Sequence, residues 1–286
     1  MREYIALTKP RITWLILMST GVGYFFGMKR GWNGLHDWIL LLHTLIGTGL
    51  LASGTAALNQ WYEREADCLM RRPAGRPLPT GKMTANSAMW FGIGRAVVGF
   101  VELAVWVNLL TGVLGALTLG AYLFIYTPLK QRSHLSTVIG ALPGAVPPLM
   151  GYAASNGALT AEAWTLFAIL AFWQIPHFMA IAWLYRDEYA KAGFVMLPNV
   201  DADGSRTAQY AVANTVALFA ASLCPFVLHM NGAIYLTAAI CLGAAYFWCA
   251  VRFAGQLTAQ RARQLFFASI IYLPLLLVAM VCDKLK

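Results

Sequence analysis

Residues Asn59–Pro79 read NQWYEREADCLMRRPAGRPLP and interrupt a chain that is otherwise mostly apolar. The first eighteen of these positions carry three of the twelve acidic and four of the twenty-one basic residues. The apolar stretches on either side are each long enough to cross a membrane as a helix. The segment therefore indicates a polar connection between two spanning helices of an all-α protein.

The composition supports a polytopic membrane protein that forms a single domain over residues 1–286. Hydrophobic residues make up 59% of the chain and charged residues 12%, with a mean hydropathy of +0.61. Soluble domains carry about 25% charged residues. The net charge of +9 does not indicate nucleic-acid binding, because no basic stripe exists outside the short loops.

The cysteines and the N-terminal residues exclude several other classes. The five cysteines show neither CxxC spacing nor a Cys/His ligand pattern, so we expect no disulfide framework and no zinc site. The first residues match neither a cleavable signal peptide nor a transit peptide. We therefore expect direct, multi-pass insertion into a bacterial inner (plasma) membrane.

The apolar segments predict nine transmembrane helices, packed as a bundle. They cover residues 11–28, 38–58, 87–108, 111–127, 135–155, 163–185, 209–230, 232–252 and 265–283. A short Leu-Leu-Thr-Gly link is expected between the third and fourth helices, and a Met-Asn-Gly link between the seventh and eighth.

The distribution of basic residues predicts the orientation of this bundle. With the N-terminus cytoplasmic, the outer segments hold only Lys29, Arg30, Lys284 and Lys286, whereas sixteen basic residues fall in the N-terminal segment and inner loops. Cytoplasmic loops of membrane proteins carry such an excess of Lys and Arg. The C-terminus is therefore expected on the periplasmic or extracellular side.

The polar segment between the second and third helices is the main candidate site. Asn59, Glu63 and Asp67 are spaced i, i+4, i+8 and share one face of a helix. Two carboxylates and an amide oxygen suit Mg²⁺, which binds one or two protein carboxylates together with substrate phosphates. Glu63 and Asp67 are also predicted as catalytic residues. The alternative is a salt-bridged helix extension at the membrane surface.

The arginines that follow predict a diphosphate site beside this metal site. Guanidinium groups bind phosphate oxygens in a bidentate manner. The candidates are Arg71, Arg72 and Arg76. Pro73, Pro77 and Pro79 fix the loop around them, which a plain surface extension does not require.

A second basic element follows the fourth predicted helix. It contains Tyr126, Lys130 and Arg132, which we predict to contact the leaving diphosphate, with Lys130 also catalytic. The alternative is ordinary interfacial anchoring by a tyrosine and two basic residues.

A third polar element follows the sixth predicted helix. Asp187 and Glu188 are adjacent, so on a helix their side chains diverge by about 100° and cannot both face one site. Asp187 is predicted as a metal ligand and catalytic residue. Glu188 and Lys191 are candidates for the acceptor or a second metal site. Alternatively, Asp187 and Lys191 form a surface ion pair at i, i+4.

Arg95, Glu102 and His177 are polar residues inside predicted spanning helices that require an explanation. Arg95 and Glu102 are seven residues apart on one helix face, and we expect them to pair with each other or with neighbouring helices. His177 stands beside Pro176 and is either a satisfied core histidine or a contact of the acceptor.

Several of these blocks resemble the membrane-embedded prenyltransferase superfamily and, within it, the haem-modifying branch. The blocks are Thr8-Lys9-Pro10-Arg11, the Asn59/Glu63/Asp67 motif with Arg76-Pro77-Leu78-Pro79, Tyr126–Arg132, Pro176-His177-Phe178 and the Asp187–Pro198 segment. The chain differs from the superfamily pattern in having Glu63 where aspartate is more common. It also differs at Lys191, where the second acidic motif has aspartate.

The resemblance implies a nine-helix bundle around a central cavity with a cytoplasmic loop cap. It implies Mg²⁺-assisted departure of diphosphate from farnesyl diphosphate and attack on the farnesyl cation by a vinyl group of haem B. Water addition then gives haem O. The implied partners are farnesyl diphosphate, haem B, the lipid bilayer, and haem A synthase or the terminal-oxidase assembly machinery.

Two alternatives remain open at this stage. A membrane prenyltransferase acting on an aromatic acid or quinone precursor keeps the donor chemistry and changes the acceptor. A secondary transporter also accounts for nine helices. Transporters place coupling charges near the middle of the membrane, whereas the acidic clusters here lie at one membrane face, which favours an enzyme.

Overall fold

A computed structural model describes residues 1–28, 31–32, 34–71 and 73–285. Over these residues the protein is all-α, as predicted, and the structure contains one isolated antiparallel bridge, between Asn231 and Lys284. The two residues of this bridge join the α13–α14 connection to the C-terminal segment.

The helices follow one another along the whole chain. Their bounds are α1 Arg2–Leu7, α2 Pro10–Gly27, α3 Gly34–Tyr62, α4 Arg64–Asp67, η1 Pro73–Gly75, α5 Ala85–Trp106, α6 Leu109–Gly120, η2 Ala121–Tyr126, α7 Thr127–Leu129, α8 Ser136–Ala145, α9 Pro147–Asn156, α10 Ala161–Leu184, α11 Arg186–Lys191, α12 Leu197–Val200, α13 Ser205–Val227, α14 Ala233–Gly255 and α15 Ala259–Cys282. Here η1 is a 3-10 turn and η2 a π-helical turn.

Eight helical segments of the described chain are long and apolar enough to cross a membrane. Two of them are composite: Leu109–Leu129 joins α6, η2 and α7, and Ser136–Asn156 joins α8 and α9 across Val146. The first predicted span is helical as α2, but it is not among these eight. The count of nine spanning helices therefore stays a prediction.

The predicted link between the third and fourth spans is wrong by a few residues. Leu-Leu-Thr-Gly is the first turn of α6, and the connection consists of Val107 and Asn108. The side chain of Asn108 accepts a hydrogen bond from Thr111 N at 2.8 Å. This N-cap satisfies a donor of the first turn and starts the helix earlier than hydropathy alone indicates.

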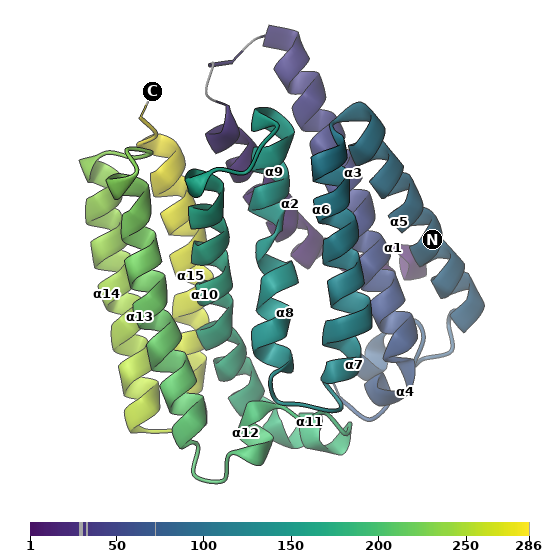
Figure 1. Cartoon of the computed structure of the whole chain (residues 1–286). Coiled ribbons are helices and arrows are strands. Elements are labelled where there is room, and N and C mark those ends of the chain that lie inside the picture. Colours follow the sequence, from purple (N-terminus) through teal and green to yellow (C-terminus); the bar gives the residue numbers. More distant parts are fainter. Residues whose placement is uncertain (29–30, 33, 72, 286) are drawn as a thin grey trace.

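The centre of the bundle is formed by α8, α9 and α10. The α8–α9 span is 72% buried and α10 is 61% buried, whereas none of the other six spans exceeds 39%. Figure 1 shows α10 between the group α13, α14 and α15 and the group α8, α9, α6, α3 and α5. The outer faces of the remaining spans expose large apolar side chains, as expected for contact with lipid.

Helices α2 and α9 approach closely because glycines line their contact. A Cβ atom on Gly23 would lie 2.0 Å from the Pro148 carbonyl oxygen. One on Gly151 would lie 1.9 Å from the Thr20 carbonyl oxygen. Small residues allow membrane helices to pack backbone to backbone in this way.

The short helices gather at one end of the bundle, here called the loop end. Figure 1 shows α4, α7, α11 and α12 at the lower end, with the C-terminus at the opposite end. An apolar cluster joins the two long polar loops: Ala66 and Met70 of the first pack with Ala192, Phe194 and Met196 of the second. The structure therefore brings the predicted polar elements together.

Arg95 and Glu102 do not pair with each other. The Glu102 carboxylate contacts His43 Nδ1 at 2.6 Å, and the His43 ring stacks on Trp106 with centroids 5.5 Å apart. Arg95 Nε instead donates to Ser53 Oγ at 2.6 Å. Both residues thus interact with α3, which lies beside α5 over most of its length.

Candidate active site

The Asn59, Glu63 and Asp67 side chains lie on one helical face, as predicted. The helical hydrogen bonds continue through the junction of α3 and α4, with Glu63 N to Asn59 O at 2.9 Å and Asp67 N to Glu63 O at 2.8 Å. All three residues are buried, at 1%, 7% and 2% exposed. A buried row of amide and carboxylate oxygens requires partners, because an unpaired buried charge is costly.

Each residue of this row contacts a different cation. Lys9 Nζ donates to Asn59 Oδ1 at 3.1 Å, Lys130 Nζ to Glu63 Oε1 at 2.7 Å, and Arg76 Nη1 to Asp67 Oδ2 at 2.5 Å. The three cations come from the α1–α2 connection, the end of α7 and the loop after η1. We call these six residues the paired row.

Lys9 is a member of the paired row that the sequence analysis did not select as a site residue. It immediately precedes α2 and adopts a left-handed conformation with φ of +45°. Such a conformation is costly for a residue other than glycine, asparagine or aspartate and often marks a functional position. Burial and the nearby Arg76 lower the pKa of Lys9 to about 7, against the raising effect of Glu63.

Lys130 is held at the centre of the loop end. Its Nζ lies 4.4 Å from the centroid of the Tyr126 ring and 5.8 Å from that of Phe194. Its carbonyl oxygen accepts from Val195 N at 2.7 Å, which ties the second loop to α7. Burial opposes the charge of Lys130, yet the Glu63 carboxylate offsets it, and the pKa of Lys130 is raised well above its usual value.

For the pKa of Asp67, burial outweighs the charged partner, whereas for Lys130 the partner outweighs burial. Burial raises the pKa of its carboxyl group more than the contact with Arg76 lowers it. The carboxylate therefore depends on Arg76 for its charge at this depth.

A π-helical turn, η2, precedes Lys130 in the chain. Thr127 Oγ1, directly after this turn, donates to the Tyr122 carbonyl oxygen of the turn at 2.8 Å. Such turns often occur at functional sites.

The other predicted diphosphate contacts differ in where they lie. Arg71 and Arg132 are exposed, and Arg72 lies outside the described residues. Tyr126 faces Lys130, as stated above. The roles of Arg71, Arg72 and Arg132 stay predictions, whereas Arg76 belongs to the paired row through its contact with Asp67.

The structure separates the two acidic residues of α11. The Asp187 side chain is 89% exposed and lies 3.8 Å from Arg186 Nε, and not against Lys191 as the sequence suggested. It lines a polar cavity of about 320 Å³ with Asn199 and Asp201. Glu188 Oε2 is fully enclosed and has no hydrogen-bond partner. Glu188 is therefore the better placed ligand candidate, and the metal role of Asp187 stays a prediction.

The metal prediction rests on the paired row. Among the described residues no group of three or more His, Cys, Asp or Glu side chains is arranged to hold a metal ion. The amide oxygen of Asn59 and the carboxylates of Glu63 and Asp67 are nevertheless the hard oxygen ligands that Mg²⁺ prefers. In the donor types that they offer, these three residues fit a magnesium ion.

His177 is fixed between aromatic rings inside α10. Its ring lies 5.0 Å from that of Trp173 and 5.1 Å from that of Phe266. Ser269 Oγ donates to the Phe266 carbonyl at 2.5 Å, so it accepts from His177 Nδ1 at 2.6 Å. Nε2 is then the unprotonated nitrogen, and it has no hydrogen-bond partner among the described residues.

Comparison with known sequences identifies the family of this chain. The model of the UbiA prenyltransferase family matches residues 17–271. The chain belongs to the UbiA prenyltransferase family. It is 54% identical to the protoheme IX farnesyltransferase of Solibacter usitatus, over 99% of both chains. It is 45% identical to that of Koribacter versatilis, over 99% of this chain and 94% of the relative. It is thus a multi-pass membrane prenyltransferase.

Solved structures support the same fold. A digeranylgeranylglyceryl phosphate synthase matches with a TM-score of 0.82 at 16% identity, covering 99% of this chain and 97% of the other. A UbiA homologue from Archaeoglobus fulgidus bound to DMAPP and Mg²⁺ matches with a TM-score of 0.65 at 16% identity, covering 98% and 99%. At this identity the similarity concerns the fold.

Proposed function

We propose that this UbiA-family enzyme transfers the farnesyl group of farnesyl diphosphate to a vinyl group of protohaem IX, giving haem O. The use of a prenyl diphosphate as donor is supported by the paired row, in which three buried oxygen ligands are each held by a cation. The acceptor rests on the relatives, which are named protoheme IX farnesyltransferase over the full length of this chain.

The paired row is suited to release diphosphate. Lys9, Lys130 and Arg76 are buried or half-buried, so an anion among them is stabilised more strongly than in water. When the substrate binds, these cations turn from their carboxylate and amide partners to the phosphate oxygens. Asn59, Glu63 and Asp67 would then hold Mg²⁺, which supplies charge neutralisation for the leaving diphosphate. Glu188 is the further ligand candidate on the second loop.

The C–O bond of the donor breaks with its electron pair passing to the diphosphate, which leaves an allylic farnesyl cation. The rings of Tyr126 and Phe194 beside Lys130 present electron-rich faces, which stabilise a cation. The haem vinyl group attacks this cation. Water adds to the resulting haem-side cation and loses a proton, which completes the hydroxyethylfarnesyl side chain.

His177 is the acceptor-contact candidate. Its Nδ1–H is bonded to Ser269, so the lone pair of Nε2 is available to the haem iron, and the neighbouring Trp173 and Phe266 rings can stack on a porphyrin. Lys191, the other acceptor candidate, is exposed on α11.

The loop end is proposed to face the cytoplasm of a bacterial inner membrane. Its support is the excess of basic residues in the loops at this end. The N-terminus is then cytoplasmic and the C-terminus periplasmic. Haem A synthase or the terminal-oxidase assembly machinery is the protein partner expected to receive the product.

The experiment is to incubate the purified protein with farnesyl diphosphate, Mg²⁺ and a mixture of haem B and 4-hydroxybenzoate, and to identify the products by mass spectrometry. The protein is also reconstituted in liposomes and assayed for solute uptake. The expected product is haem O, with the mass of haem B plus a farnesyl group and a hydroxyl group. Prenylation of 4-hydroxybenzoate in place of haem would show that the acceptor is an aromatic acid. Solute uptake into liposomes without any prenylation would contradict the enzyme.

A further inference from the structure

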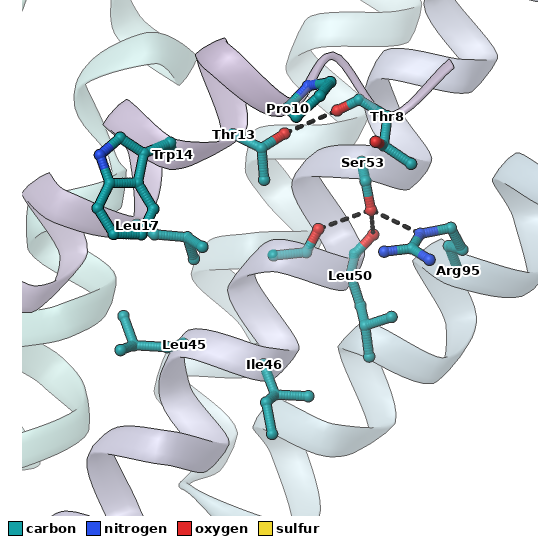
Figure 2. A pocket seen from close by; sticks show the side chains of 11 residues that line it. Thr8, Pro10, Thr13, Trp14, Leu17, Leu45, Ile46, Leu50, Ser53 and Arg95 are labelled. Carbon is teal, nitrogen blue, oxygen red and sulfur yellow. Dashed lines mark hydrogen bonds between the residues drawn. The ribbon is translucent and has the colours of Figure 1, made fainter. Parts of the chain in front are cut away.

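A groove on the outside of the bundle contains the Arg95 side chain. It has a volume of about 450 Å³ and lies between α2, α3 and α5. Figure 2 shows Thr8 and Thr13 at the end nearest Ser53 and Arg95, and Leu45 and Ile46 at the other end. Trp14 and Ile46, which line it, are exposed on the outer surface, so the groove opens toward lipid.

Among the residues that the structure describes, the charge of Arg95 has no counter-ion. Its Nε donates to Ser53 Oγ at 2.6 Å, and its guanidinium lies 5.4 Å from the Phe91 ring. The Ser53 hydroxyl hydrogen is itself directed to the Gly49 or Leu50 carbonyl, so Ser53 offers Arg95 a neutral acceptor. None of the ion pairs that the described residues form includes Arg95.

The direction of the Arg95 side chain brings its charge toward the loop end. Arg95 is ten residues into α5, about 15 Å from its start by the rise of an α-helix. Helical side chains lean toward the N-terminus of their helix, and Arg95 does so, because its guanidinium reaches the ring of Phe91 one turn earlier. The charge therefore lies nearer the loop end than its Cα atom does, while the apolar part of the groove extends deeper into the membrane.

We propose that this groove binds a phospholipid with an anionic headgroup. The phosphate supplies the counter-ion to Arg95, and one acyl chain runs past Leu17, Leu45 and Ile46. An uncompensated charge in a spanning helix is costly, and a phosphate reduces that cost by a charge-assisted contact. Basic pockets between membrane helices bind acidic headgroups in this way.

This site is separate from the paired row. Lys9, Lys130 and Arg76 hold the oxygen ligands of the row, and none of the three lines the groove. The test of lipid binding by the groove therefore does not depend on whether the proposed function is correct.

The test is native mass spectrometry of the purified protein with phosphatidylglycerol or phosphatidylcholine. The wild type is expected to retain one phosphatidylglycerol, with roughly tenfold preference over phosphatidylcholine. Arg95→Gln removes the charge and should abolish the preference, while Arg95→Lys keeps it in part. Gly49→Leu fills the groove without changing its charge and should abolish retention of either lipid. The variant should still fold, because an added Cβ there meets only Leu17, at 3.6 Å.

Two controls keep the experiment specific. Gly94→Leu adds the same side chain on α5 where nothing lies within 4 Å, and Arg11→Gln removes an exposed charge; both should bind as the wild type does. Equal retention of phosphatidylglycerol by the wild type and a monodisperse Arg95→Gln protein would overturn the proposal. Displacement of the lipid by farnesyl diphosphate that then occupies the groove would also overturn it and would assign the groove to the prenyl donor.

Discussion

The two acidic residues of α11 differ in surroundings although they are neighbours in the chain. Glu188 has an enclosed oxygen without a partner, whereas Asp187 is almost fully exposed. We expect Glu188→Gln to lower haem O formation by about 10²-fold, the scale of losing one electrostatic contact to the transition state. Asp187→Asn should change it less than about threefold. Initial rates at saturating Mg²⁺ measure both, and the reverse ranking would restore Asp187 as the ligand.

His177 gives a second prediction at the residue scale. If its Nε2 binds the iron of the acceptor, His177→Ala should shift the Soret band of haem B titrated into the protein and weaken binding about tenfold or more. Ser269→Ala removes the acceptor that fixes the tautomer and should have a smaller effect in the same direction. An unchanged Soret band in both variants would leave His177 as a core residue that only packs between Trp173 and Phe266.

The sequence predicted part of this site and missed part, for physical reasons. Asn59, Glu63 and Asp67 share a face because helical spacing is local, and that prediction is confirmed. The choice between Asp187 and Glu188 depends on how α11 packs, which adjacent positions do not reveal. Lys9 contacts Asn59 from fifty positions away. The sequence feature that could have identified Lys9 is its position directly before Pro10 and an apolar run.

At the scale of helices, the contact between α2 and α9 depends on glycine. Gly151→Ala would place a Cβ atom 1.9 Å from the Thr20 carbonyl oxygen, so the helices must separate. We expect a loss of about 1–3 kcal/mol in stability, as for overpacked cores, and a lower melting temperature in detergent. Gly21→Ala, with nothing within 4 Å, is the matched control and should melt as the wild type does. Equal melting temperatures would show that the contact is looser than described.

Hydropathy located the helices, whereas side-chain caps and packing set their ends. The second predicted span, 38–58, is shorter at both ends than α3, Gly34–Tyr62, and at the C-terminal end the added turn contains the buried polar residues Asn59 and Gln60. The α6 start at Leu109 is set by Asn108, a feature that an apolar window does not detect. The span count differs at α2, which begins with Pro10 and Arg11 and whose contact with α9 is lined by small residues such as Gly23 and Gly27; all of these lower its hydropathy.

At the scale of the whole molecule, the two polar loops meet at one end of the bundle. Cys68 is exposed at that end, and Ala158 is exposed in the connection between α9 and α10. Because Cys241 and Cys282 are also exposed, the other four cysteines are first replaced by serine. With the loop end cytoplasmic, a membrane-impermeant maleimide should then label Cys68 in inverted vesicles and not in right-side-out cells. Ala158→Cys in a Cys68→Ser background should show the opposite pattern. Labelling of Cys68 from outside the cell would invert the orientation.

The release of diphosphate by the paired row can be measured by comparing three proteins. Purified wild type, Asp67→Asn and Glu65→Gln proteins are incubated with farnesyl diphosphate, haem B and Mg²⁺, and both diphosphate release and haem O are measured. Asp67 is buried against Arg76, whereas Glu65, on the same helix, has a side chain that is 87% exposed. Asp67→Asn should lose both products by about 10²-fold or more at unchanged folding, and Glu65→Gln should stay near the wild type. Full activity of a folded Asp67→Asn protein would show that the paired row is not needed to release the diphosphate.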